Sequence, residues 1–160
     1  MSKNKKTAME AAASYLANRM RTVEEVRRRL KEKEYESAEI EETINDLIGL
    51  RYLDDYLYAM RYYEYNREKR RGSGRAAREL AEKGVDEATI RNAREDFLFE
   101  NKVDEFEDAM EVALKAAEGT EIDDKLKAKI ARKLEAKGFS KGDIIRVLGE
   151  LNGRQILKDD

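Results

Sequence analysis

Residues 69–78 read KRRGSGRAAR and combine a glycine-rich tripeptide with five basic side chains. Such a segment could bind phosphate, because the N–H groups of a glycine loop that opens a helix point at an anion and arginine pairs with its oxygens. A nucleotide site also needs a preceding strand and the spacing G-x-x-x-x-G-K-[ST], and the sequence has neither. We therefore interpret Gly72–Gly74 as a turn between helices and keep the arginines beside it as candidate contact residues.

The residue types that are missing limit the chemistry. The 160 residues include no Cys and no His, which excludes Cys/His zinc sites, disulfides, a histidine base and a cysteine nucleophile. Carboxylates, Lys, Arg, Tyr, Ser and Thr remain, and a catalytic site built from these alone is the least favoured reading. We expect a protein that is not an enzyme and needs no cofactor.

Apolar residues recur with helical spacing along nearly the whole chain, as in the stripe Val23, Val26 and Leu30. No stretch alternates in the manner of a strand, so the predicted fold class is all-α. No apolar run reaches about 18 residues, and the basic start of the chain lacks the apolar core of a secretory signal. These features predict a soluble, cytoplasmic protein with no membrane partner.

The stripes repeat in a larger pattern of three copies, anchored at Leu30, Leu80 and Leu134. Each anchor is followed three residues later by lysine, five later by a bulky residue and ten later by isoleucine; the isoleucines are Ile40, Ile90 and Ile144. Each copy therefore predicts a helix, a tight turn and a second helix, with the Leu and Ile anchors buried.

The turns of the second and third copies carry Gly84 and Gly138, which can adopt the left-handed conformation that ends a helix. The first copy has Glu34 there, so we expect its turn to be closed differently. Ser37 and Asp86 stand near the starts of the following helices and are expected to cap them.

A further helix precedes each pair, at about residues 6–20, 54–71 and 102–118, which gives nine predicted helices. They define three three-helix units: residues 1–50, residues 51–100, which carry the central motifs, and residues 101–160, which end in a C-terminal tail. Because one such unit buries little apolar surface alone, we expect the units to stack as an elongated, curved array. A monomer is expected.

Basic residues gather on the middle helix of each predicted unit, although the net charge of the chain is −2. A basic ridge along a stacked array would suit a polyanion or an acidic, elongated protein. The alternative is an ordinary solvated surface in which pairs such as Glu24 and Arg28 neutralise each other. The cations that we select as candidate contacts are Arg27, Arg28, Arg70, Arg71, Arg75, Arg78, Lys129 and Arg132.

Six of the eight tyrosines lie between Tyr52 and Tyr65. On a helix that begins near Asp54, one face carries Tyr58, Tyr62 and Tyr65, and a second carries Tyr56 and Tyr63. We expect the first face to be buried, and we assign Tyr56 and Tyr63 to contact with a partner.

Two linked motifs resemble the RecX family of bacterial recombination regulators. The first consists of Tyr52-Leu53-Asp54-Asp55 with Tyr58-Ala59, and the second of Gly72, Glu79-Leu80 and Lys83-Gly84-Val85. Weaker echoes at residues 26–33 and 130–139 match the family's first and third modules, so the resemblance extends over most of residues 8–152. The sequence departs from the family at Arg51, where glycine is usual, and at Ala76, where Ile or Leu is usual.

The resemblance implies a non-enzymatic protein that binds RecA and the RecA filament on single-stranded DNA. It would lie in the groove of the filament and limit filament growth, ATP hydrolysis and strand exchange in recombination and repair. The alternative is a helical module that binds nucleic acid through its repeated basic helices. The balance of 33 basic against 35 acidic residues favours at most weak direct binding of DNA.

Overall fold

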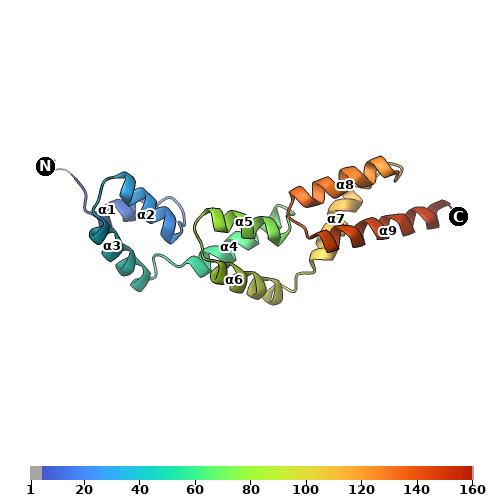
Figure 1. Ribbon diagram of the computed structural model, residues 1–160. Coiled ribbons are helices and arrows are strands. Elements are labelled where there is room, and N and C mark those ends of the chain that lie inside the picture. Colours follow the sequence, from blue (N-terminus) through green and yellow to red (C-terminus); the bar gives the residue numbers. More distant parts are fainter. Residues whose placement is uncertain (1–4, 160) are drawn as a thin grey trace. The chain divides into compact units, whose positions relative to one another are not determined.

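The computed structural model describes residues 5–159 and contains nine α-helices and no strand in that range (Figure 1). The predicted all-α class is confirmed. The helices are α1 (Ala8–Leu16), α2 (Val23–Glu32), α3 (Ser37–Gly49), α4 (Asp55–Glu68), α5 (Ser73–Glu82), α6 (Glu87–Glu100), α7 (Glu105–Ala117), α8 (Asp124–Ala136) and α9 (Lys141–Asp159).

The first and last three helices each form a bundle, in which every helix packs on the other two. The apolar stripes point inward, as their helical spacing requires. The core of α1–α3 contains Val26, Leu30, Ile40, Ile44 and Leu47, and that of α7–α9 contains Phe106, Met110, Ile130, Leu134, Ile144 and Leu151.

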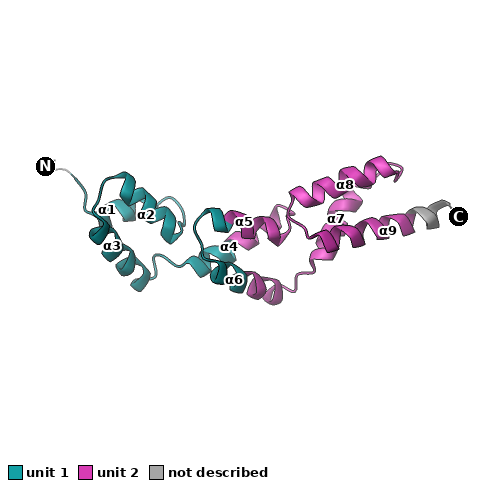
Figure 2. Ribbon diagram, in the orientation of Figure 1, with its two compact units in different colours: residues 1–61, 80–93 teal, residues 62–79, 94–160 magenta. Residues whose placement is uncertain are grey.

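The chain divides into two compact units, residues 1–61 with 80–93 and residues 62–79 with 94–160 (Figure 2). Helices α4, α5 and α6 each contribute residues to both units. The expected anchors Leu80 and Ile90, both in the first unit, are buried, which confirms their predicted place in the core.

The three helix–turn–helix pairs end their first helices with the same backbone pattern. In the first, Tyr35 N–H donates to Leu30 O (3.2 Å) and Glu34 N–H donates to Lys31 O (2.9 Å). The same two bonds recur around Gly84 and Gly138, and together they satisfy carbonyls that a helix end leaves unpaired. Glu34 has φ 66°, so the expectation of a different closure was wrong: a non-glycine residue occupies the left-handed position.

Non-glycine residues adopt left-handed backbone at three other helix ends, with φ 63° at Arg51, 59° at Arg70 and 50° at Lys102. Each residue follows a helix, α3, α4 or α6, whose last turn it closes by donating to a carbonyl three residues earlier. Arg51, which stands at the family's usual glycine, is therefore at a position whose backbone favours glycine.

The predicted cap at Asp86 is confirmed, because its carboxylate accepts from Thr89 N–H at 2.8 Å. The predicted cap at Ser37 was wrong. Ser37 is already the first residue of α3, and Glu36 precedes it without a side-chain capping bond.

Two equivalent joints hold the start of a middle helix against the turn of the following helix–turn–helix pair. In the first unit, Thr22 Oγ1 donates to Lys83 O at 2.7 Å; in the second, Gly72 N–H donates to Lys137 O at 2.8 Å. A Cβ on Gly138 would lie 2.4 Å from Arg75 N. The backbones thus approach closely, and glycine at the turn makes room for it.

A carboxylate reinforces each joint. Asp55 Oδ1 accepts from Val23 N–H at 2.9 Å, and Glu105 Oε2 accepts from Ser73 N–H at 3.1 Å. Asp55 and Glu105 are the first residues of α4 and α7, and each caps the N-terminus of an earlier middle helix. The structure confirms the predicted turn only at Gly72, because Ser73 and Gly74 are already the first residues of α5. Gly72 is also one side of the second joint.

Candidate partner interface

Five basic side chains converge where the α4–α5 turn meets the α8–α9 turn in the second unit. Burial lowers the pKa of Lys137, and the nearby positive charges lower it further. Like charges that lie close together repel each other, so keeping each group ionised costs free energy. An anion bound at the site would offset this cost. We call this set, Arg70, Arg71, Arg75, Lys133 and Lys137, the basic cluster.

The joint positions the cluster. The Gly72–Lys137 bond brings the residues beside Gly72 to the end of α8. Asn66 Nδ2 donates to Gly72 O at 2.9 Å and fixes the turn from within, where Asn66 is buried. The bond between Gly72 and Lys137 joins two backbone groups and does not depend on the surrounding side chains, whereas the bond from Asn66 depends on that side chain.

Two cluster members already have carboxylate partners. Arg70 pairs with Glu111 at 2.6 Å, and Arg75 pairs with Glu79 at 2.8 Å. The Tyr62 hydroxyl donates to Glu79 and, together with Arg75, lowers the pKa of that carboxyl. Among the side chains of residues 5–154, Arg71, Lys133 and Lys137 have no ion-pair partner, so their charges are available to a partner molecule.

The structure places the other predicted cations differently. In the first unit, Arg27 donates to Glu41 and Glu24, each at 2.7 Å; the hydrogen bond to Glu41 is the main cause of the raised pKa of Arg27. Arg28 lies 3.7 Å from Glu24. These pairs are those of an ordinary solvated surface, in which carboxylates neutralise the arginines. Arg78 is exposed on α5, and Lys129 and Arg132 are exposed on α8, the helix that carries Lys133.

The assignment of Tyr63 to a partner surface was wrong. It is 1% exposed and stacks on Phe97, with ring centroids 5.9 Å apart. Burial raises the pKa of Tyr63 to about 12. Helix α4 turns this side chain toward α6, and the expected burial of the other face holds for Tyr58 but not for Tyr65, which is 49% exposed.

Tyr56 is exposed, as its assignment to contact with a partner requires. Four other large apolar side chains close to it in the sequence, Ile48, Leu50, Tyr52 and Leu57, are also exposed, also lie in the first unit and were not selected from the sequence. Only Ile48 belongs to α3, and Leu57 lies on α4. Lys133 and Lys137 were not selected as candidate contacts, because only the joint shows that they approach Arg71.

The described part of the chain has no group of three or more acidic side chains arranged to hold a metal ion. None of its helices is long and apolar enough to cross a membrane.

Helix–turn–helix repeats joined through their turns, with a basic cluster at one joint, define a helical-repeat protein. Residues 8–47 match the family model of the first three-helix domain of RecX. Regulatory protein RecX of Vibrio parahaemolyticus is 35% identical over 135 residues, which cover 84% of this chain and 84% of that protein. This chain belongs to the RecX family.

One further relative and one solved structure are informative about the length and the fold of the chain. Regulatory protein RecX of Halalkalibacterium halodurans is 36% identical over 131 residues, covering 81% of this chain and 48% of the relative. The chain thus spans about half the length of the first curated relatives it matches. The crystal structure of RecX from Lactobacillus salivarius has a TM-score of 0.78 at 29% identity, covering 91% of this chain and 94% of that one.

Proposed function

We propose that this protein regulates RecA by binding RecA and its filament on single-stranded DNA, in the cytoplasm, and that it limits ATP hydrolysis and strand exchange. Membership of a family of regulatory proteins supports a regulatory role. The structural observation that carries the proposal is the basic cluster, in which Arg71, Lys133 and Lys137 have no ion-pair partner among the described residues.

The basic cluster carries positive charge that is only partly balanced by carboxylates. Cations held close together on a rigid joint repel each other, and an anionic surface relieves that repulsion when it binds. Arginine can pair in a bidentate manner with carboxylates of a protein wall or with phosphates, while lysine acts as a point charge. A filament of protein on DNA offers both kinds of anion.

The test measures RecA ATP hydrolysis on single-stranded DNA while this protein is added. The cluster variant is Arg71→Gln, Lys133→Gln and Lys137→Gln. Arg70 and Arg75 are left unchanged, because Arg70 closes a helix end with left-handed backbone and Arg75 packs against Gly138. The matched control, Arg61→Gln, Arg91→Gln and Lys115→Gln, removes the same charge from exposed positions elsewhere.

We expect the wild type and the control to suppress hydrolysis and the cluster variant to need a concentration about tenfold or more higher, as for the loss of one or more charge-assisted contacts. No suppression by the wild type in stoichiometric excess would refute the function. Equal potency of wild type and cluster variant would remove the cluster from the contact surface and leave the function to be carried by other residues.

Direct binding of nucleic acid is a second candidate, favoured by the same unpaired cations. It predicts binding of single-stranded DNA without RecA, and this binding should weaken as salt rises.

A further inference from the structure

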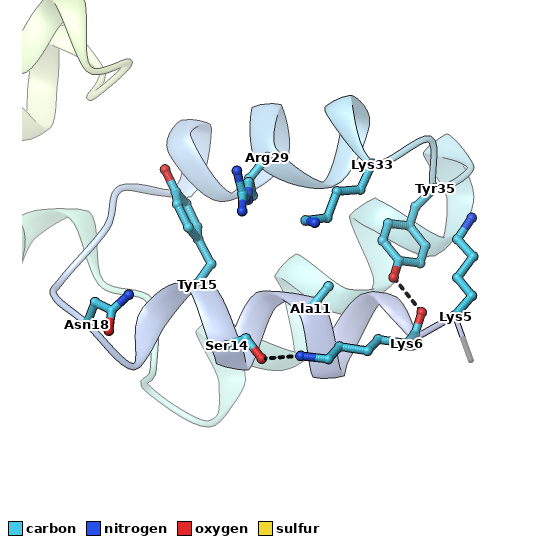
Figure 3. Close-up of a pocket in the computed structure, with 9 residues that line it drawn as sticks. All are labelled: Lys5, Lys6, Ala11, Ser14, Tyr15, Asn18, Arg29, Lys33 and Tyr35. Atoms are coloured by element: carbon cyan, nitrogen blue, oxygen red, sulfur yellow. Dashed lines mark hydrogen bonds between the residues drawn. The ribbon is translucent and has the colours of Figure 1, made fainter.

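A cavity of about 450 Å³ opens between α1 and α2 in the first bundle, and no function described above uses it (Figure 3). Lys6, Ser14 and Tyr15 line it from the side of α1, Arg29 and Lys33 from α2, and Tyr35 from the turn that follows α2. In Figure 3 the Lys33 side chain extends into the space between the two helices, and the Lys6 side chain runs along α1 to Ser14. The volume is within the range of about 300–1,000 Å³ that is typical of small-ligand sites.

The lining is strongly cationic. It includes Lys5, Lys6, Arg29 and Lys33 and no Asp or Glu. In the part of the chain that the structure describes, none of these four side chains forms an ion pair. Three carboxylates of the same two helices have partners outside the lining: Glu10 accepts from Thr7 N–H at 3.4 Å, Glu25 accepts from Thr22 N–H at 3.0 Å, and Glu24 accepts from Arg27 at 2.7 Å.

Neutral partners hold the cations in place. Lys6 Nζ donates to Ser14 Oγ at 3.0 Å, and the Tyr35 hydroxyl donates to the carbonyl of Lys6. The guanidinium carbon of Arg29 lies 5.3 Å from the centre of the Tyr15 ring. Such contacts orient a cation without cancelling its charge, so the charges remain available to an anion.

Both aromatic rings are already covered by cations. Arg21 lies 3.9 Å from the centre of the Tyr15 ring, and Lys5 lies 4.6 Å from that of Tyr35. A base that stacked on either ring would have to displace a cation. A ligand with several negative charges and no requirement for stacking fits the cavity better, and phosphate oxygens match the fork of Arg29 and the ammonium groups of lysine.

We propose that this cavity binds a diphosphate or triphosphate group, free or as part of a nucleotide, and does not discriminate among bases. The four cations oppose the several negative charges of such a group. The site is independent of the RecA proposal, and its test needs neither RecA nor single-stranded DNA.

The test titrates the 160-residue chain with inorganic pyrophosphate, following heat by calorimetry and backbone amide shifts by NMR. ATP and GTP are titrated in the same way, and a thymidine oligonucleotide without a terminal phosphate is the comparison for phosphodiesters. The site variant is Arg29→Gln with Lys33→Gln. The matched control is Arg28→Gln with Lys31→Gln, which removes two exposed cations of the same helix that do not line the cavity.

We expect pyrophosphate, ATP and GTP to bind with similar affinity and to shift amides of α1 and α2. The site variant should bind at least about tenfold more weakly, as for the loss of charge-assisted hydrogen bonds, and the control should bind like the wild type. No binding of pyrophosphate at about 1 mM would overturn the proposal. So would equal losses in the two variants, shifts outside α1 and α2, or binding of the oligonucleotide alone.

Discussion

Arg51 adopts a backbone conformation, φ 63°, that costs a residue with a Cβ about 1 kcal/mol or more. Its side chain is exposed, so little in the tertiary structure offsets this cost. Glycine adopts the same conformation without the steric penalty, although it loses more backbone entropy on folding.

We predict that Arg51→Gly raises the free energy of unfolding by about 0.5–1 kcal/mol, the difference between these two effects. Urea unfolding of both proteins measures it. The control is Arg61→Gly, an exposed position inside α4, where glycine should lower stability by about 1 kcal/mol. A loss of stability in Arg51→Gly would show that the left-handed position does not carry the expected strain.

The second prediction at this scale concerns Asp55, which caps α2 from the start of α4. Burial raises the pKa of this carboxyl, and the hydrogen bond from Val23 N–H lowers it in part. Since the folded-state pKa lies above the unfolded value, the contribution of Asp55 to stability is fully present below the unfolded pKa and is lost as pH rises through the folded pKa.

Asp55→Asn removes this titration and keeps an oxygen that can accept from Val23. We therefore predict that the stability of wild type relative to Asp55→Asn falls between about pH 3 and pH 6, across and above the usual range of an aspartate. Urea unfolding at several pH values measures the difference. A difference that is constant with pH, or that grows as pH rises, would contradict the prediction.

At the scale of elements, the two joints depend on backbone atoms meeting at close range. Gly138 has φ 95°, and a Cβ there would lie 2.4 Å from Arg75 N and 2.4 Å from Arg75 Cβ. Neither the left-handed backbone at Gly138 nor the space beside Arg75 tolerates a side chain at this position. Gly149, inside α9, has no neighbour within 4 Å of an added Cβ.

Gly138→Ala should therefore destabilise the protein by about 2 kcal/mol or more, the sum of left-handed strain and steric overlap. Gly149→Ala, the same chemical change, should stabilise it by about 0.5–1 kcal/mol. Thermal unfolding of both variants measures the contrast. Changes of the same sign would mean that the close approach at the joint does not limit position 138.

The helices and turns were the features that the sequence predicted best, and the errors made there have physical causes. The spacing of Leu30, Leu80 and Leu134 predicted the three helix–turn–helix pairs, because burial of an apolar stripe imposes helical periodicity. The prediction for the turn at Glu34 was wrong because the hydrogen bonds that end α2 form there with a non-glycine residue in left-handed backbone. The prediction for Tyr63 was wrong because α4 carries aromatic residues on most of its faces, so that helical periodicity could not identify the buried face. Lys137 could not be linked to Arg71, 66 positions earlier, without the joint.

At the scale of the whole molecule, the net charge of −2 does not show that some cations are paired with carboxylates and others are not. Arg27 and Arg28 are paired with carboxylates, whereas Arg71, Lys133 and Lys137 have no ion-pair partner among the side chains of residues 5–154. Any direct binding of single-stranded DNA through the basic cluster should therefore involve about three phosphates.

We predict a salt slope near −2 for that binding, which corresponds to a loss of roughly 20-fold in affinity between 50 and 200 mM salt. Fluorescence anisotropy with a labelled oligonucleotide measures it, and the cluster variant should show a slope close to zero. A slope of −5 or steeper would indicate that cations outside the cluster, such as Lys129 and Arg132, bind phosphates as well.

The joints also affect how such a protein can change in evolution. The joints are made by backbone N–H and C=O groups together with a turn glycine, one carboxylate and, in the first joint, the hydroxyl of Thr22. Every three-helix segment can supply the backbone groups whatever its sequence. A duplicated stretch of gene encoding three helices would bring its own attachment points and would need few compensating substitutions. The number of helix triplets is therefore a property that duplication can alter while surface side chains diverge freely.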